Sequence, residues 1–256
     1  MDLSMFSLEG RSAIVTGASR GLGKACALAL ADAGADVVCT SRDLEALRRT
    51  AKAIEAKGSK ALTLVADILS EESIGNMVKQ ALGHFGKIDI LVNNAGLAKV
   101  APVQYLDSAD WDLVLNTNLK GAFLLCKAIL PEMKKRSYGR IINVSSLGGL
   151  RGTKNLSSYD ASKAGLIKFS EALALEVVGY NITVNCICPG YILTDMNREF
   201  FESEKGKMEI DKYPMKRPGY LSDIGGALIF LASDAASYVT ATTVIVDGAQ
   251  RWKGAL

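Results

Sequence analysis

Residues 12–23 read SAIVTGASRGLG, a short apolar run followed by a turn that contains three glycines. The first five residues are mostly apolar and β-branched, which predicts a strand. A segment with helical periodicity follows the turn, from about residue 22 to residue 33. A strand, a tight turn and a helix in this order begin a βαβ unit, and such units build parallel sheets.

The same alternation continues along the chain. Further strands are expected at 36–40, 61–66, 88–92, 140–145, 182–187 and 243–246, with helices at 44–57, 70–85, 109–135, 159–178 and 221–232. The strand segments are continuously apolar, which is typical of strands buried on both faces. No composition break, repeat or linker interrupts the pattern. The sequence therefore predicts one α/β domain over 1–256, a Rossmann-like, doubly wound parallel sheet of about seven strands with helices on both faces.

Composition and charge exclude several classes of protein. The net charge of +3 over 256 residues gives no electrostatic case for nucleic acid or an anionic membrane as partner. The five cysteines lack framework spacing and indicate buried thiols in a reducing compartment. A single histidine, His84, rules out a multi-histidine metal site, and we expect no metal. The N-terminus does not read as a secretory signal and no apolar run is expected to reach membrane-spanning length, so we expect a cytoplasmic protein.

Polar or glycine-containing motifs follow six of the predicted strands. They are TGASRGLG at 16–23, Ser41-Arg42, Asp67, NNAG at 93–96, Ser146 and Pro189-Gly190. The carboxyl ends of parallel strands meet at one edge of the sheet, and α/β sheets bind their ligands there. We therefore expect these six motifs to lie together.

The glycine turn is the expected phosphate site. Gly17 permits the tight turn, Gly21 lets a diphosphate approach the positive helix N-terminus, and Gly23 allows close packing of helix on strand. The spacing G-x-x-x-G-x-G differs from the commoner dinucleotide fingerprint, and alone it is also compatible with a structural turn. The other turn residues expected to contact the cofactor are Ser19, Arg20 and Leu22.

The end of the second strand favours NADP(H) over NAD(H). An acidic residue there would bind the adenosine ribose of NAD and repel a 2′-phosphate, but this chain has Ser41 and Arg42. Arg42 and Arg20 can both reach toward that phosphate, which guanidinium groups suit, unless they simply face water. Asp67 is expected to accept a hydrogen bond from the adenine amino group or, alternatively, to cap the next helix.

Tyr159 and Lys163 lie four residues apart in a helical segment and therefore share one face. A fixed positive charge favours the phenolate and lowers the phenol pKa from about 10 toward neutrality. Such a group can give or take a proton near neutral pH. An isolated Tyr-x-x-x-Lys is a weak signal, because both residues are common on helices.

Together the motifs resemble the short-chain dehydrogenase/reductase family, and the resemblance covers nearly all of 8–248. It is carried by TGASRGLG, NNAG, Asn118 in NTNLKG, Ser146, Tyr159-x-x-x-Lys163, and Pro189-Gly190 with Thr194. The resemblance implies an oxidoreductase that transfers a hydride between NADP(H) and a ketone or secondary alcohol. No metal is needed, since the cofactor carries the hydride.

The resemblance also implies a catalytic tetrad of Asn118, Ser146, Tyr159 and Lys163. Tyr159 would act as general acid in reduction and base in oxidation, and Ser146 would hydrogen-bond the substrate oxygen. Lys163 would lower the tyrosine pKa and bind the nicotinamide ribose, and Asn118 would hold a water in a proton relay. Ser145 and Asn116 are competing candidates, which the family spacing disfavours.

Further cofactor contacts follow from the same resemblance. They are Ile68, Asn93, Asn94, Ala95, Gly96, Tyr159, Lys163, Pro189, Gly190, Ile192 and Thr194. Asp160 stands where the family usually has a small apolar residue; we expect it to face solvent, although its charge could partly offset Lys163. Ala241 and Ala249 replace usual glycines near the C-terminus. This region often contributes to subunit packing in the family, and we expect a homotetramer or homodimer.

Substrate choice is where the sequence leaves alternatives open. A mobile lid is expected at about 194–214, with Met196, Phe200, Phe201 and Met208 packing it onto the body rather than touching substrate. The predicted pocket flanks are mostly nonionic: Leu147, Leu150, Asn155 and Tyr191.

The chain resembles both 3-oxoacyl carrier-protein reductases and sugar-acid or polyol dehydrogenases. Carrier docking in the reductases uses two arginines. Arg136 matches one of them, but Tyr180 stands at the other position, so a small free carbonyl substrate is slightly favoured. A non-catalytic NADP(H)-binding regulatory protein is the alternative from another class, and the intact tetrad argues against it.

Overall fold

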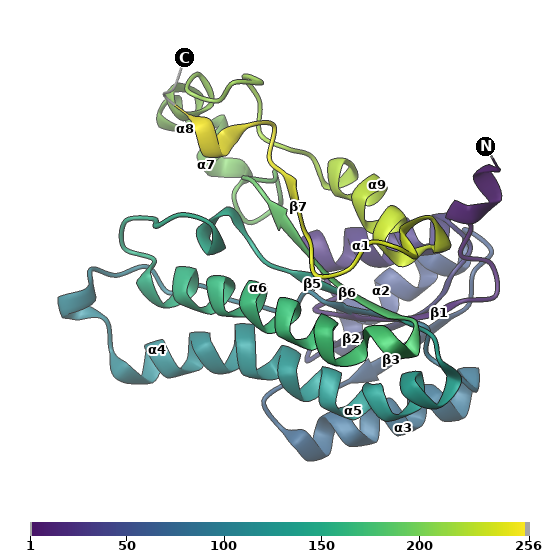
Figure 1. The fold of residues 1–256 in the computed structure, drawn as a ribbon. Helices are drawn as coiled ribbons and strands as arrows, with labels where there is room; N and C mark the ends of the chain where they lie inside the picture. Colours follow the sequence, from purple (N-terminus) through teal and green to yellow (C-terminus); the bar gives the residue numbers. More distant parts are fainter. Residues whose placement is uncertain (1, 254–256) are drawn as a thin grey trace.

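A seven-stranded parallel sheet lies at the centre of the computed structural model, which describes residues 2–253 (Figure 1). The strands are β1 (Ser12–Thr16), β2 (Asp36–Ser41), β3 (Ala61–Val65), β4 (Ile90–Asn93), β5 (Gly139–Val144), β6 (Ile182–Pro189) and β7 (Thr243–Val246). Their order is β3-β2-β1-β4-β5-β6-β7, and each neighbouring pair is parallel. The order reverses between β1 and β4, where doubly wound sheets bind ligands. The predicted fold class is confirmed.

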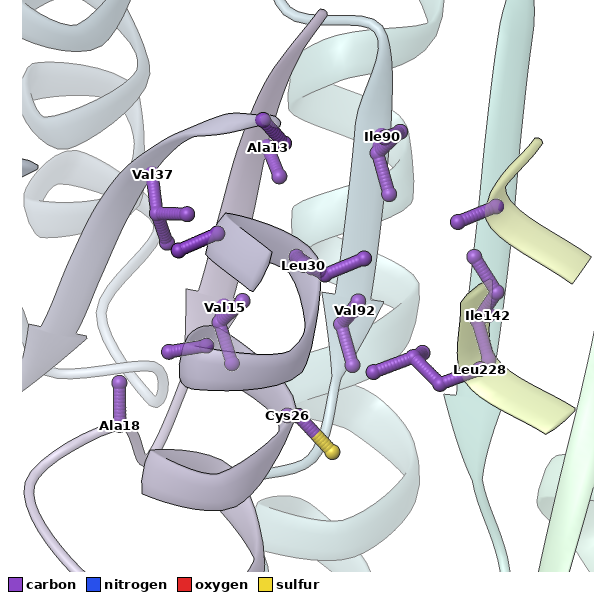
Figure 2. Close-up of a cluster of buried hydrophobic side chains, with 14 of the residues drawn as sticks. Ala13, Val15, Ala18, Cys26, Leu30, Val37, Ile90, Val92, Ile142 and Leu228 are labelled. Carbon is purple, nitrogen blue, oxygen red and sulfur yellow. The ribbon is translucent and has the colours of Figure 1, made fainter. Parts of the chain in front are cut away.

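Helices cover both faces of the sheet (Figure 1). One face packs against α1 (Gly21–Asp32), α2 (Leu44–Glu55) and α9 (Leu221–Ala232), and the other against α3 (Glu71–Phe85), α5 (Gly121–Arg136) and α6 (Ser157–Val177). Successive strand residues point to opposite faces. Val15 therefore joins the first core, beside Leu30 and Leu228 (Figure 2), whereas Ile14 joins the second.

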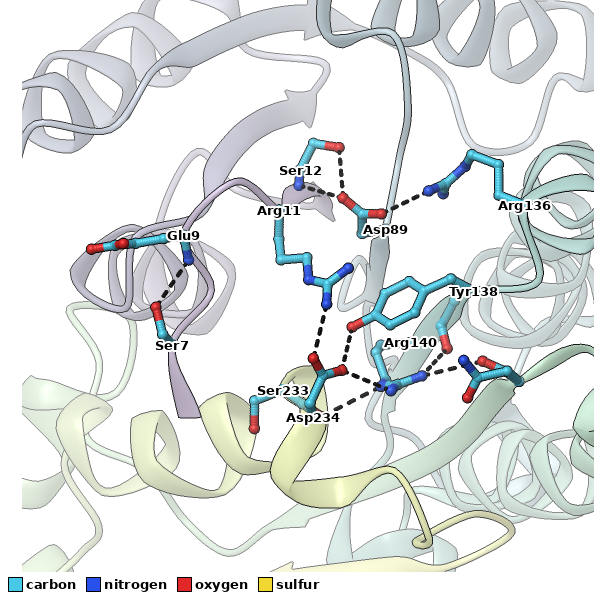
Figure 3. Close-up of polar contacts among 12 residues, drawn as sticks. Ser7, Glu9, Arg11, Ser12, Asp89, Arg136, Tyr138, Arg140, Ser233 and Asp234 are labelled. Atoms are coloured by element: carbon cyan, nitrogen blue, oxygen red, sulfur yellow. Dashed lines mark hydrogen bonds and ion pairs between the residues drawn. The ribbon is translucent and has the colours of Figure 1, made fainter. Parts of the chain in front are cut away.

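A buried carboxylate ties the start of β1 to the start of β4. Asp89 has no exposed surface, and its Oδ2 accepts a hydrogen bond from the Ser12 backbone N–H at 3.0 Å. Its Oδ1 lies 2.8 Å from Nη1 of Arg136 on α5 (Figure 3). β4 begins at Ile90, two residues later than expected. Asp89, just before it, bonds to Ser12 through both its side chain and its backbone N–H.

A second polar cluster joins the N-terminal segment to the end of α9. Arg140 is buried, and its Nη2 lies 3.1 Å from Oδ1 of Asp234. The same carboxylate pairs with Arg11 at 2.8 Å and accepts a hydrogen bond from the Tyr138 hydroxyl (Figure 3). Two distant chain segments thus share one charge network.

The helix predicted at 109–135 is interrupted. α4 (Ser108–Leu115) passes into a π turn (Asn116–Lys120) before α5 begins. The sequence predicts a single helix because a π turn adds only one residue to a helical turn, and this changes the apolar periodicity too little to be detected. Single π turns often occur at functional sites, and this one carries Asn118.

The continuous helical run Ser108–Arg136 is long and apolar enough to cross a membrane by length and composition alone. The expectation that no run reaches that length is therefore wrong for this segment. However, Leu125, Ile129 and Met133 of the run are buried in the second core cluster. The core helix of a soluble protein passes the same test, so the run is weak support for a membrane span.

Ala241 and Ala249 both adopt left-handed backbone conformations, with φ of 56° and 63°. Glycine adopts this region without steric cost, whereas an L-residue is disfavoured there. The backbone geometry thus explains why glycine suits these two positions, and the alanines here carry local strain.

Candidate active site

The glycine turn after β1 packs directly against the loop after β4. Thr16 Oγ1 accepts hydrogen bonds from the backbone N–H groups of Asn94 and Ala95, both at 3.0 Å, and Asn94 Nδ2 donates to Thr16 O at 2.9 Å. Gly17 has a φ of +67°. A Cβ atom at Gly23 would lie 2.2 Å from the Gly17 carbonyl oxygen, so only glycine fits. Two of the predicted motifs are thereby held together.

Gly21 lies at the open N-terminus of α1, with a φ of +53°. A Cβ atom there would meet nothing nearer than the Thr194 methyl group at 4.0 Å. The backbone is thus accessible at the positive end of the helix, as a diphosphate requires. Thr194, from the loop after β6, lies over the same turn. The residues present fit a dinucleotide.

Arg20 and Arg42 are both exposed, and neither guanidinium forms an ion pair or hydrogen bond with another residue in 2–253. They flank the ends of β1 and β2, which pair along their whole length. Asp67 does not cap α3: its Oδ1 accepts from the Leu69 N–H at 3.0 Å, and Ser70 is the cap. The capping alternative for Asp67 is therefore wrong.

Asn118 joins three parts of the site. Its Oδ1 accepts from the Leu97 N–H at 2.8 Å, and its Nδ2 donates to Leu97 O and to Ser162 Oγ, each at 2.9 Å. A Cβ atom at Gly96 would lie 3.0 Å from Asn118 Oδ1 and 3.5 Å from Lys163 Nζ. The π turn, the β4 loop and α6 thus meet at Gly96.

Lys163 is buried, and its Nζ donates to the Val144 carbonyl oxygen at 2.7 Å. Burial lowers the pKa of this ammonium to about 8, so it remains mostly protonated at neutral pH. Its Nζ lies 5.8 Å from the centroid of the Tyr159 ring. The two residues share one face of α6, as their spacing predicts.

The two serines after β5 have different partners. Ser145 is buried, and its Oγ donates to the Lys163 carbonyl oxygen at 2.9 Å. Ser146 Oγ accepts from the Gly148 N–H at 3.1 Å, and its side chain lies close enough to the phenol to lower the pKa of Tyr159. Side chains alternate in direction at the strand end, so Ser145 points to the α6 backbone and Ser146 lies on the side of Tyr159.

The pKa of Tyr159 is raised, chiefly by burial. The nearby Ser146 side chain opposes this rise in pKa, while the charge of Asp160 adds to it. The phenol pKa near neutrality that the Tyr159–Lys163 spacing predicts is therefore not found, because burial, the largest cause, favours the neutral phenol. The Lys163 ammonium donates its hydrogen bond to the Val144 carbonyl oxygen instead.

Two further expectations are corrected. Asn93 is buried, and its Nδ2 donates to Asn143 Oδ1 at 2.8 Å, so it joins β4 to β5 and does not line the cofactor region. Asp160 is only partly exposed, and its carboxylate is turned inward. Its Oδ2 accepts from the Thr153 N–H, and its Oδ1 is buried without a hydrogen-bond partner in the described chain.

The loop after β6 begins at Pro189-Gly190 and leads into the lid. Ile192 pairs with Gly219, so the two ends of the lid are joined. The lid contains α7 (Arg198–Glu202) and α8 (Glu204–Ile210). Tyr213 is buried and stacks on Tyr191, with ring centroids 6.2 Å apart.

The lid's apolar residues divide into two groups. Phe201 is buried and packs edge-on against Tyr191, as expected for a residue that fastens the lid to the body. Met196 and Met208 are exposed, and Phe200 is partly so. The expectation that all four pack the lid is therefore wrong for the two methionines.

The C-terminal segment has a role that sequence reasoning missed. Gln250 is buried, and its Oε1 accepts from the Tyr191 N–H at 2.6 Å. Lys253 pairs with Glu209 of α8, and Arg151 Nη1 donates to Arg251 O at 3.3 Å. This segment fastens both the lid and the loop after β5. These contacts span up to a hundred residues, and no local pattern signals them.

The remaining predicted contacts occupy the same edge of the sheet. Ser41 Oγ accepts from the Asp43 N–H, and Ile68 packs on Gly121 at the start of α5. A Cβ atom at Gly190 would lie 2.5 Å from Gln250 Oε1. Within 2–253, no group of three or more histidine, cysteine, aspartate or glutamate side chains is arranged to hold a metal ion.

Comparison with known proteins identifies the family. Residues 11–205 match the model of the short chain dehydrogenase family. The 3-oxoacyl-acyl-carrier-protein reductase of Pseudomonas aeruginosa is 41% identical over 242 residues, which are 94% of this chain and 98% of that protein. The 2-dehydro-3-deoxy-D-gluconate 5-dehydrogenase of Escherichia coli is 39% identical over 250 residues, 97% of this chain and 98% of that protein.

A solved structure has the same fold throughout. It is a gluconate 5-dehydrogenase from Burkholderia cenocepacia, in complex with NADP and tartrate, with a TM-score of 0.92 and 32% identity over 97% of this chain and 98% of that one. The match of fold, family model and sequence leads to one conclusion: this chain belongs to the short-chain dehydrogenase/reductase family of oxidoreductases, which act on CH–OH groups and the corresponding carbonyls.

Proposed function

We propose that this enzyme transfers a hydride between NADP(H) and a small free carbonyl compound or its secondary alcohol, of the sugar-acid or polyol class. The observation that carries the chemistry is the meeting of Asn118, Ser146 and the Tyr159–Lys163 pair beside the glycine turn. Hydride transfer to a carbonyl builds negative charge on oxygen. Hydroxyl donors aimed at that oxygen stabilise it.

Each member of the tetrad has a distinct role in this proposal. Ser146 and Tyr159 donate hydrogen bonds to the substrate oxygen, and Tyr159 also delivers the proton in reduction and removes it in oxidation. Lys163 keeps a positive charge beside the phenol, and Asn118 holds the β4 loop against α6. When bound, the nicotinamide cofactor supplies or accepts the hydride.

The cofactor would be held by residues from all six motifs. The turn contributes Gly17, Ser19, Arg20, Gly21 and Leu22, and the later motifs contribute Ser41, Arg42, Asp67, Ile68, Asn94, Ala95, Gly96, Tyr159, Lys163, Pro189, Gly190, Ile192 and Thr194. The guanidinium groups of Arg20 and Arg42, which are exposed and have no partner among residues 2–253, support NADP(H) over NAD(H). The NADP bound to the related gluconate 5-dehydrogenase agrees with this choice.

Arg42→Ala is expected to weaken NADPH binding about tenfold or more, because a charge-assisted hydrogen bond to the 2′-phosphate is lost. NADH, which lacks that phosphate, should bind almost as before. Titration calorimetry with both cofactors measures the difference. Arg48→Ala, which removes an exposed guanidinium from α2, the helix that follows Arg42, is the matched control. Equal losses for NADPH and NADH in Arg42→Ala would contradict the 2′-phosphate assignment.

The preference for a small substrate rests on the side chain of Arg136. This residue matches one of the two carrier-docking arginines, but its guanidinium pairs with Asp89 and Glu132 and donates to the Ile88 carbonyl. The other position, Tyr180, lies beneath the Lys134 ammonium at 4.9 Å. Neither position presents a free arginine to an acidic carrier protein. The tartrate in the related dehydrogenase is consistent with a hydroxy-acid substrate.

The second candidate is reduction of a 3-oxoacyl thioester. It is favoured by the 41% identity to a 3-oxoacyl-acyl-carrier-protein reductase. A cofactor-oxidation screen with NADPH and NADH, against keto-sugar acids and 3-oxoacyl thioesters, separates the two. Turnover only of thioesters would overturn the small-substrate proposal. NADPH binding without turnover of any carbonyl or polyol would instead favour a regulatory protein.

The assembly state is proposed as a homotetramer or homodimer. Several large apolar side chains on the α4–α6 side stay exposed in the isolated chain: Trp111, Phe123, Leu175 and Val178. Exposed apolar side chains gathered on one side of a molecule commonly mark a protein interface. Light scattering of the purified protein measures the assembly directly.

A further inference from the structure

Asp160, the residue after Tyr159, turns its carboxylate into the protein. Its Oδ2 accepts a hydrogen bond from the Thr153 N–H, and its Oδ1 is buried with no hydrogen-bond partner in 2–253. A Cβ atom at Gly148 would lie 2.2 Å from this Oδ1 and 3.3 Å from Cε1 of Tyr159. Gly148 therefore packs close to both the carboxylate and the phenol ring, and a side chain at this position would collide with the carboxylate.

The segment 146–153 carries Ser146 and is held at both ends. At its start, Ser145 is fixed to the α6 backbone and Ser146 Oγ accepts from the Gly148 N–H. At its end, the Thr153 N–H is held by the Asp160 carboxylate. The distance between Ser146 and the phenol therefore depends on a hydrogen bond made by the residue next to Tyr159.

The charges around this pair come from several elements. The positive charge of Arg151 acts on Asp160, and the Lys163 ammonium lies 5.8 Å from the centroid of the phenol ring. The neutral side chains of Cys188, Tyr191 and Ser146 also act on the phenol. Burial raises the pKa of Asp160, opposed by the Thr153 hydrogen bond and by Arg151. The negative charge of Asp160 in turn raises the pKa of Tyr159. Its effect on the phenol is opposite in sign to that of the Lys163 ammonium.

We propose that Asp160 is a positioning residue with two separable actions: its carboxylate oxygen holds the segment 146–153 against α6, and its negative charge opposes ionisation of Tyr159. The effect on turnover rests on the proposed role of Tyr159 as the proton donor and acceptor. The two structural actions do not depend on that role, and they are measured without substrate.

Two substitutions separate the actions. Asp160→Asn keeps a carbonyl oxygen that accepts from the Thr153 N–H but removes the charge, whereas Asp160→Ala removes both. Asp112→Asn, an exposed carboxylate on α4, is the matched control for loss of one negative charge. A variant that keeps the hydrogen bond and loses the charge identifies which action produces each change.

The charge action is read from Tyr159 itself. A near-ultraviolet phenolate difference titration, with the corresponding Tyr159→Phe protein subtracted, follows this one phenol among eight tyrosines. Asp160→Asn should ionise Tyr159 at lower pH than the native protein, and Asp112→Asn should not. In the oxidation direction the acidic limb of the pH profile should move the same way, since the base form appears earlier. An unchanged Tyr159 titration in Asp160→Asn would overturn the charge action.

The positioning action is read from amide hydrogen exchange at Thr153. Exchange should be at least about tenfold faster in Asp160→Ala, because loss of a charge-assisted hydrogen bond exposes the amide, and near native in Asp160→Asn. Native protection of Thr153 in Asp160→Ala would overturn this action. If the alanine variant does not fold, Asp160→Leu replaces it, because leucine fills the space without providing an acceptor. Fast exchange at Thr153 in Asp160→Leu would support the positioning action, and native protection would contradict it.

These readouts distinguish failure of the inference from failure of the proposed function. If Tyr159→Phe stays active, the acid–base assignment falls while the titration and exchange results still decide the role of Asp160. If Tyr159→Phe is inactive but Asp160→Asn shifts neither the titration nor the pH profile, the assignment survives and the charge action does not.

Discussion

Replacing Tyr159 with phenylalanine is expected to lower turnover by about a thousandfold, within the usual range for loss of a general acid–base group. The phenol is the only group we place to exchange a proton with the substrate oxygen, and Ser146 lies beside it. NADPH affinity should change little, because the ring and the buried Lys163 remain. Steady-state kinetics on the best substrate of the screen, with cofactor titration, measures both quantities.

The control for this substitution is Tyr105→Phe, which removes a hydroxyl from an exposed tyrosine outside the predicted site. It should leave turnover and cofactor affinity unchanged. Substantial activity in Tyr159→Phe would show that another group carries the proton. A parallel loss of NADPH binding would show that the phenol acts mainly in binding.

Asp89→Ala is expected to lower the free energy of unfolding by about 3 kcal/mol, because removing one partner leaves a partly buried cation uncompensated. Asp89 is fully buried and contacts Arg136 and the Ser12 N–H (Figure 3). It also pairs with Lys87 at 3.3 Å. This value is at the lower end of the usual cost of breaking a buried ion pair, because the Arg136 guanidinium keeps some exposure to solvent and its hydrogen bond to the Ile88 carbonyl oxygen. Urea unfolding at several protein concentrations measures the change and corrects for assembly.

Asp32→Ala serves as the comparison. Its carboxylate pairs with Lys57 at 2.6 Å, but both side chains are substantially exposed. Exposed pairs contribute at most about 1 kcal/mol, so this variant should lose little stability. If Asp89→Ala and Asp32→Ala were destabilised equally, the buried ion pair between β1 and β4 would stabilise the protein no more than an exposed ion pair does.

The arrangement of the sheet could be predicted because its signals are local and consistent. Continuous apolar runs located the strands, and the rule that ligands bind at their carboxyl edge placed Ser146 and the glycine turn together before any contact was known. Strand and helix ends were less predictable. β4 begins at Ile90, just after Asp89, and the apolar pattern of the segment does not mark this boundary.

The features that escaped prediction depend on contacts between distant parts of the chain. The direction of Asp160 follows from the space at Gly148 and the Thr153 amide, neither of which a helical pattern reveals. The pKa direction of Tyr159 is a balance between burial and nearby charges, and spacing identifies only the charges. Gln250 reaches Tyr191 across 59 residues of sequence, beyond any local motif.

All five cysteines are free and buried. Burial raises the pKa of four thiols, Cys26, Cys39, Cys126 and Cys186, to about 12, and it also raises that of Cys188. Because the thiolate is the reactive form, the folded chain offers an alkylating reagent almost no target. Reaction must wait for the structure to open. The rate of thiol alkylation therefore measures how often each part of this fold opens, without any engineered label, and Cys188 reports on the edge of the sheet beside Pro189.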